Sequence, residues 1–352
     1  MKKVKLIIVF SFIWTTSFAQ VVFNRIIEDT VANITSSVIN VDTGYVYVTG
    51  TNNPELKRCF ALFYVDNEGI RQWKKIFPDN NFEFWEGWSS NFKVQSGDCF
   101  LTGSALNSVE VKRGIHFTEF DNQFNLLTQQ ISFYDTIYKK AYYTIKDLDK
   151  YYYSTGQIYD YDIQKFRMFL FKADSLGNYL WHKVLGNYVY EYGSYLLETS
   201  AGTILTGGET WITDISRAKW YLVNTDTAGN IIWEKYYGRN YYNNGYVSCF
   251  LEANDTNILL TGTYPVARYG GGSGEYIWDA CLRKIDTNGN LLWERLYRNY
   301  SCHPTGTNIN LSGSIKTLLE LGNGDLMLCG SSQWYYTILR GYLIKTDSEG
   351  NI

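Results

Sequence analysis

The chain has 352 residues and a formal net charge of −3, with 32 Lys and Arg against 35 Asp and Glu. The two signs are interspersed, which excludes the basic footprint of a nucleic-acid-binding protein and a polybasic membrane patch. Aromatic residues make up 17% of the chain and there are only 4 Pro. This composition suits β-strands and predicts an all-β protein.

The first residues have the pattern of an export signal. Three lysines precede an apolar run from Leu6 to Trp14, and Ser17-Phe18-Ala19 fits a small-x-small cleavage site. The run is too short to span a membrane, and no other stretch approaches ~20 apolar residues. We therefore expect a signal peptide at residues 1–19, no membrane span, and an exported protein that is periplasmic, on the cell surface or secreted.

Two markers recur along the rest of the chain. The first runs Asp-x-x-Gly, usually followed by Asn, with Trp seven residues after the Asp; its best copies are Asp66, Gly69 and Trp73, then Asp174, Gly177 and Trp181, then Asp226, Gly229 and Trp233, then Asp286, Gly289 and Trp293. The second is Thr-Gly, with glycines at 50, 103, 156, 207 and 262 and a degenerate copy at 330. A period of roughly fifty residues is typical of propeller blades or solenoid units.

Each repeat is predicted to form four antiparallel strands, because its apolar runs are short and are separated by turn residues. In the Asp turn, the carboxylate accepts backbone N–H groups ahead of it and the glycine adopts a positive φ. Repeat two has Phe124 at the glycine position and Thr128 at the Trp position, so we expect its turn to be built differently. The repeated Trp is expected to pack between sheets rather than to bind a ligand.

The two ends of the chain suggest how the sheets close into a ring. Phe23–Ile27 matches the outer strand of a repeat, and the chain stops at Ile352, just before the last outer strand would begin. We therefore expect one domain over residues 20–352, a monomeric β-propeller of six four-stranded blades closed by the N-terminal strand. Seven or more blades are expected if the chain is a fragment.

The repeat resembles the β-propellers of exported bacterial proteins that often carry a type IX secretion sorting domain, with such wording at Leu343 to Asn351. The resemblance covers nearly all of the chain after residue 19. The quinoprotein-like propellers with a tryptophan motif are more distant, because their Asp and Gly are usually four apart, whereas Asp174 and Gly177 are three apart. Sialidase Asp-boxes differ in spacing as well. Neither similarity carries a catalytic residue across.

Length variation between repeats is confined to the loops between strands two and three and between blades. These loops are rich in aromatic residues, which suit recognition of a sugar or protein surface. The candidate ligand-binding residues are Trp85, Trp88, Tyr190 and Tyr242. The alternative is that these side chains only cover the ends of a Tyr-rich sheet.

Catalytic and metal-binding patterns are sparse. The 3 His have no metal-ligand spacing, and we expect no catalytic residue, metal or cofactor. The predicted function is a binding or scaffolding module for a glycan or protein, with a propeller hydrolase or lyase acting on extracellular polysaccharide as the alternative. The 6 Cys show no disulfide framework, which leaves free buried thiols and one or two bridges both open.

Overall fold

The computed structural model describes residues 34–41, 43–52, 58–85, 91–95, 98–107, 109–110, 112–133, 139–187, 190–211, 218–238, 245–268, 276–297, 299–302, 308–334 and 338–352. These residues form 25 strands in six antiparallel sheets. The prediction of an all-β, six-bladed propeller of mostly four-stranded sheets is therefore confirmed.

The blades follow one another in chain order. The first is β1 (Ile34–Val41), β2 (Gly44–Asn52), β3 (Arg58–Asp66) and β4 (Arg71–Phe77); the second is β5 (Phe82–Trp85), β6 (Asn91–Gln95), β7 (Asp98–Asn107), β8 (Lys112–Phe120) and β9 (Leu126–Ser132); the third is β10 (Lys139–Lys146), β11 (Tyr152–Asp160), β12 (Lys165–Ala173) and β13 (Tyr179–Leu185). The fourth is β14 (Tyr190–Glu198), β15 (Ile204–Trp211), β16 (Ala218–Thr225) and β17 (Ile231–Tyr237); the fifth is β18 (Val247–Glu252), β19 (Ile258–Arg268), β20 (Tyr276–Ile285) and β21 (Leu291–Tyr297); the sixth is β22 (Asn299–Cys302), β23 (Asn308–Glu320), β24 (Leu326–Trp334) and β25 (Ile338–Thr346).

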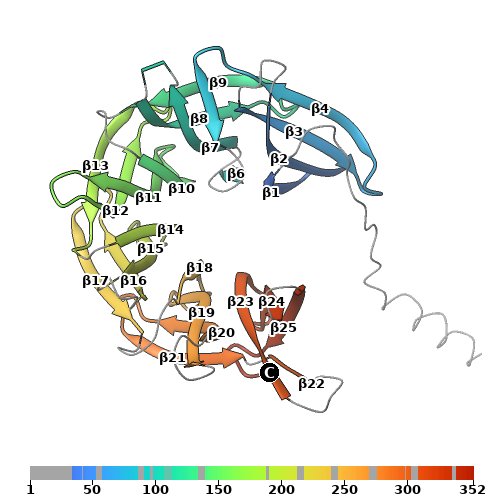
Figure 1. The fold of residues 1–352 in the computed structure, drawn as a ribbon, viewed down its shortest axis with the longest axis vertical. Helices are drawn as coiled ribbons and strands as arrows, with labels where there is room; N and C mark the ends of the chain where they lie inside the picture. Colours follow the sequence, from blue (N-terminus) through green and yellow to red (C-terminus); the bar gives the residue numbers. More distant parts are fainter. Residues whose placement is uncertain are drawn as a thin grey trace, which may run out of the picture.

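Figure 1 shows the six sheets set radially around an arc, with the first full strand of each blade on the inner side and the last on the outer side. Among the described strands, those of the sixth blade and those of the first do not pair. The second and sixth blades depart from the simple pattern: β5 and β6 share one inner position along β7, and β22 pairs only with the start of β23. The predicted closing strand, Phe23–Ile27, lies outside the described residues.

The hydrophobic core lies between blades rather than within them. Five clusters of buried side chains fill the five successive interfaces between adjacent blades. Neighbouring residues on one strand serve opposite interfaces: Tyr152 faces the second blade and Tyr153 faces the fourth. Because both faces of each middle strand are buried, these strands are almost continuously apolar instead of alternating.

All six Asp turns have one geometry. In the turn at Asp226, the carboxylate accepts the N–H groups of Ala228 at 2.9 Å and Asn230 at 2.8 Å, and Gly229 has a φ of 81°. The turns at Asp66, Asp121, Asp174, Asp286 and Asp347 repeat both backbone contacts. Hydrogen bonding of the carboxylate also lowers the pKa of Asp226.

The second repeat corrects one expectation. Its turn is not built differently: Phe124 takes the glycine's place with a φ of 59°, and its N–H donates to the Asp121 carbonyl at 2.9 Å. The left-handed conformation costs a non-glycine residue about 1–2 kcal/mol. Packing offsets this cost, because the Phe124 ring is buried and lies 5.7 Å from the Trp73 ring of the first blade.

The repeated Trp and the repeated Gly meet across blade boundaries. A Cβ on Gly229 would lie 2.8 Å from the Trp181 ring, and one on Gly289 would lie 2.9 Å from the Trp233 ring. The Trp233 indole N–H also donates to the Thr287 carbonyl, at 2.8 Å. Each of these Trp side chains is half-buried and packs on the Asp turn of the next blade.

Most inner strands contain a one-residue bulge next to the Thr-Gly marker. A Cβ on Gly156 would lie 1.9 Å from the Lys140 carbonyl oxygen, so only glycine fits there. In the fourth repeat the equivalent residue is Gly208, at 1.8 Å from the Tyr192 carbonyl oxygen, and not Gly207. In the run Thr206-Gly207-Gly208, the second glycine therefore holds the position that the Thr-Gly marker assigns to the first.

In the described part of the chain, no helix is long and apolar enough to cross a membrane. Five of the six cysteines have described side chains, and all five are free: Cys59, Cys99, Cys249, Cys281 and Cys329.

Candidate functional site

The two kinds of connection lie at opposite ends of the blades. Both short hairpin turns of a blade lie at one end, and the loops between strands two and three and between blades lie at the other, which we call the loop face. Of the four predicted ligand-binding residues, Tyr190 is described in full and Trp85 by its backbone at the end of β5. Trp88 and Tyr242 lie outside the described residues, so the grouping of the four stays a prediction.

Tyr190 has an aromatic neighbour at the loop face. It begins β14 and is paired with Trp211 at the end of β15, with ring centroids 6.3 Å apart and an interplanar angle of 70°. The Tyr190 side chain is 38% exposed. The Lys165 Nζ, which comes from the third blade, lies 5.2 Å from the centre of its ring. The pair therefore presents aromatic surface beside a positive charge.

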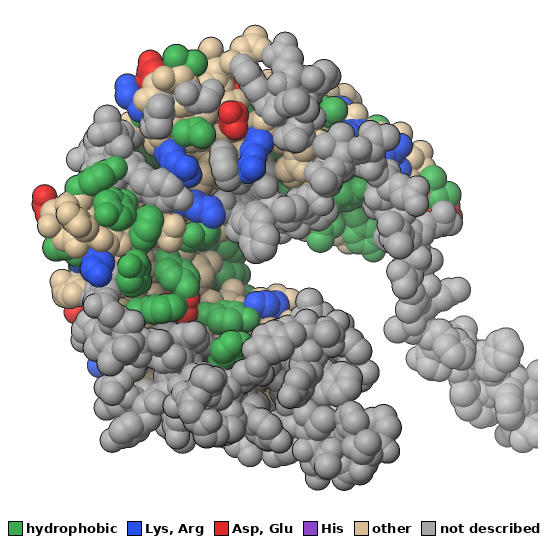
Figure 2. Space-filling view, in the orientation of Figure 1, with side chains coloured by type: hydrophobic (Ala, Val, Ile, Leu, Met, Phe, Trp, Pro, Cys, Tyr) green, Lys and Arg blue, Asp and Glu red, His purple; other side chains and the backbone are tan. Residues whose placement is uncertain are grey.

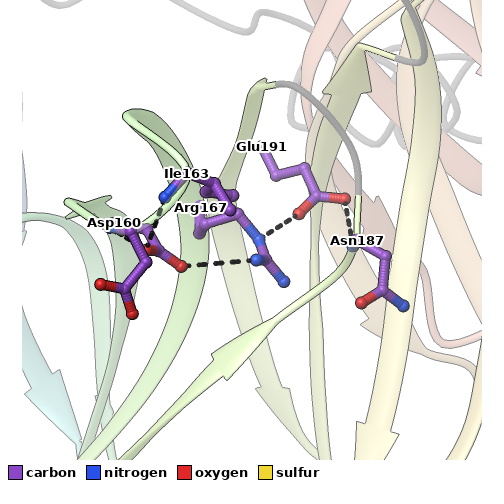
Figure 3. Close-up of polar contacts among 6 residues, drawn as sticks. Asp160, Ile163, Arg167, Asn187 and Glu191 are labelled. Atoms are coloured by element: carbon purple, nitrogen blue, oxygen red, sulfur yellow. Dashed lines mark hydrogen bonds and ion pairs between the residues drawn. The ribbon is translucent and has the colours of Figure 1, made fainter.

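A largely buried ion pair joins Arg167 to Glu191, the residue that follows Tyr190 (Figure 3). The Arg167 Nε of β12 lies 3.2 Å from Oε2 of Glu191, and its Nη1 lies 3.6 Å from Oδ2 of Asp160. The Glu191 side chain is fully buried. Because Arg167 belongs to the third blade and Glu191 to the fourth, the pair joins the two blades beneath the loop face.

Gly186 and Asn187, at the start of the connection between these blades, contact the Glu191 carboxylate. Oε1 accepts the Asn187 backbone N–H at 3.1 Å and the Thr210 hydroxyl at 3.2 Å. A Cβ on Gly186 would lie 2.1 Å from Oε2, so glycine is needed for the close approach. A buried charge is tolerated when its hydrogen bonds are satisfied. Glu191 thereby fixes the backbone that carries the neighbouring Tyr190.

A second aromatic group flanks the ion pair on the third blade. The Tyr159 ring is 4.8 Å from the Tyr161 ring and 5.1 Å from the Phe166 ring, both in edge-on contact. Tyr161 is 59% exposed. The carboxylate of Asp160 accepts the Asp162 N–H at 3.1 Å, which closes the loop between β11 and β12.

Two histidines occupy structural positions. The buried His116 ring stacks on Phe60 at 5.9 Å, and its Nδ1 lies 3.1 Å from the Thr118 hydroxyl. His182 Nδ1 lies 3.2 Å from the Tyr179 hydroxyl. Within the described ranges, no group of three or more His, Cys, Asp or Glu could hold a metal ion.

One buried carboxyl has no signal in the sequence. Glu209 on β15 is 7% exposed, and burial raises the pKa of its carboxyl to about 8. Arg167 and Glu191 were missed as well, because they are 24 residues apart and come from different repeats. The sequence feature nearest to this ion pair is Gly186, which precedes an aromatic run. Its role, close contact of the backbone with the Glu191 carboxylate, follows only from the fold.

No family model matches the chain, and no curated protein matches it. Among solved structures it is similar to an acylaminoacyl peptidase from Pyrococcus horikoshii, with a TM-score of 0.48, 10% identity, and coverage of 90% of this chain and 46% of the peptidase. It is also similar to the GH93 α-L-arabinofuranosidase of Fusarium graminearum, with a TM-score of 0.46, 10% identity, and coverage of 85% of this chain and 89% of the arabinofuranosidase. A third similar structure is the β-propeller domain of the Trilobed protease from Pyrococcus furiosus, with a TM-score of 0.39, 9% identity, and coverage of 90% of this chain and 95% of that domain. The likeness carries no argument about activity or ligand.

Proposed function

We propose that this protein is an exported or cell-surface β-propeller that binds a glycan through the loop face of its third and fourth blades. The Tyr190–Trp211 pair supports this proposal most. Tyr190 is exposed and Trp211 is half-buried. Both lie on paired strands rather than in the middle of a loop, and Glu191 of the ion pair directly follows Tyr190. Such support preorganises a binding surface and lowers the entropy lost on binding.

The chemistry of the patch favours a glycan. The Tyr190 and Trp211 rings lie together, and the Lys165 amine lies beside Tyr190. The face of an aromatic ring is electronegative and accepts the apolar C–H face of a sugar. Charged side chains at the edge of the rings can hydrogen-bond to the sugar hydroxyls. Export fits the resemblance of the repeat to type IX-associated propellers.

One observation favours the alternative, a hydrolase or lyase that acts on extracellular polysaccharide. The Glu209 carboxyl is protonated below a pKa of about 8, and a protonated carboxyl at neutral pH is what a general acid requires. An enzyme needs a second group placed across the scissile bond. The carboxylate on the neighbouring strand, Glu191, is paired with Arg167.

A glycan array combined with a turnover assay distinguishes the two functions. A binding module should retain a defined set of glycans on the array and release no reducing ends or unsaturated products from them over many hours. Product release that is lost in Glu209→Gln would establish the enzyme instead. An array without any bound glycan would contradict the proposed function.

A further inference from the structure

The inner strands converge on a cluster of polar side chains that the loop-face site does not use. Equivalent positions follow the bulges of successive blades: Tyr143 on β10, Tyr195 on β14, Cys249 on β18 and Thr317 on β23. Lys93 on β6 lies beside the first of them. The cluster therefore spans five blades along the inner side of the arc.

Lys93 is the only cation in contact with this cluster among the described residues. Its Nζ donates to the Tyr143 hydroxyl at 2.7 Å and lies 3.9 Å from the centre of that ring. The Tyr143 and Tyr195 ring centroids are 4.0 Å apart. In the part of the chain that the structure describes, no carboxylate is paired with Lys93. A buried amine without a counter-charge is a site that an anion would stabilise.

Two more lysines on inner strands are arranged in the same way. The Lys316 Nζ of β23 donates to the Tyr246 hydroxyl at 2.8 Å and lies 4.4 Å from its ring centre. The Lys140 Nζ of β10 lies 5.1 Å from the Tyr142 ring centre. Figure 2 shows basic side chains along the inner side of the arc, with hydrophobic side chains between them.

We propose that Lys93, Lys140 and Lys316 bind the carboxylate groups of an acidic saccharide that lies along the inner side of the arc, with the half-buried Tyr142 and Tyr246 packing on its sugar rings. The half-buried Tyr142 and Tyr246 favour a saccharide over an acidic peptide, because they offer ring surface beside Lys140 and Lys316. This site is separate from the loop-face patch and does not depend on it.

The titration of Lys93 provides a direct readout of an anion. Burial lowers the pKa of its amine to about 7. The other titratable groups that face it are neutral at this pH, since burial raises the pKa of the Tyr143 and Tyr195 hydroxyls and of the Cys249 thiol. A carboxylate beside the amine favours its charged form and so raises its pKa.

The experiment is an NMR titration of the full chain carrying ¹³C-labelled lysine. D-glucuronate is added up to about 100 mM, with D-glucose as the neutral probe and tri-glutamate as the peptide probe. The Lys93 signal is assigned by its loss in Lys93→Met or, if that variant does not fold, in Lys93→Arg. Lys172 is the matched internal control, because its Nζ also lies over a tyrosine ring, 4.1 Å from the centre of Tyr151. Lys172 belongs to β12, the third strand of its blade, and not to an inner strand.

The proposal expects glucuronate to shift the Lys93 signal saturably and to raise the midpoint of its pH titration by about one unit or more. Glucose should leave the signal unchanged, and Lys172 should respond to neither probe. Tyr190→Ala should not alter the response, which separates this site from the loop face. An unmoved Lys93 signal, an equal response to glucose, or tighter binding of tri-glutamate than of glucuronate would overturn the proposal.

Discussion

Gly229 of the fourth blade leaves the space that the Trp181 ring of the third blade fills, since a Cβ on this glycine would lie 2.8 Å from the indole. The same glycine has a φ of 81° and closes the Asp turn. One residue thus meets two independent demands, a left-handed backbone and close contact with the neighbouring blade. This explains why Gly and Trp recur in step along the sequence.

Replacement of Gly229 by Ala should therefore cost more stability than the backbone conformation alone. We expect Gly229→Ala to lower the free energy of unfolding by about 2–4 kcal/mol, through left-handed strain and displacement of the indole. Gly202→Ala is the matched control, because Gly202 has a φ of 73° but a Cβ added there would meet no atom within 4 Å. It should lose only about 1 kcal/mol. Equal losses in urea denaturation would show that the blade contact contributes nothing.

Phe124 should show the opposite balance at the equivalent turn position. Its ring packs on Trp73, so removing the ring should destabilise the protein even though glycine suits the backbone better. We expect Phe124→Ala to cost about 3 kcal/mol, and Phe124→Gly about 1 kcal/mol less than that. Thermal unfolding of both variants tests this order. A stabilised Phe124→Gly would mean that strain outweighs packing at this turn.

The sequence predicts the structural features that nearby residues determine. It does not predict those that depend on contacts between residues far apart in the chain. The Asp turn follows from residues within five positions, and the blade count follows from the period. Phe124 departs from the local rule because Trp73, some fifty residues earlier, stabilises the left-handed turn through its ring. In the fourth repeat, the Thr-Gly marker points to Gly207, but it is Gly208 that lies against the bulged inner strand. Two consecutive glycines cannot be told apart by the sequence pattern.

The candidate site was only partly predictable for the same reason. Tyr190 stands out in the sequence as an aromatic residue in a variable loop. Its support does not, because Arg167 and Glu191 come from different blades and neither belongs to a recurring motif. The inner cluster around Lys93 was likewise invisible, since its members share only their position after a bulge.

Stability should depend on pH through Glu209. Because the folded-state pKa is about 8 and the ordinary value is 4.5, the folded state binds more protons than the unfolded state between these values. The free energy of unfolding should therefore fall as pH rises through this window, on the order of 2 kcal/mol between pH 5 and 7. Glu209→Gln should remove that part of the slope. Parallel pH profiles for the wild type and the variant would contradict the burial effect.

The Arg167–Glu191 ion pair should be costly to break from one side. Arg167→Met leaves the Glu191 carboxylate buried without its cation and should cost about 3–5 kcal/mol. Adding Glu191→Leu removes the stranded charge and should recover much of the loss. Urea denaturation of the two single variants and the double variant gives the coupling energy. Additive losses would show that the two side chains act independently.

The most direct test of the proposed function is calorimetric titration of the protein with the glycan it binds best on an array. Tyr190→Ala should weaken that affinity at least about tenfold, a loss of roughly 1.4 kcal/mol, while leaving the unfolding transition in place. Tyr151→Ala, at the opposite end of the third blade, should bind like the wild type. Undiminished affinity in Tyr190→Ala, or the absence of any glycan that the wild type binds, would contradict the account.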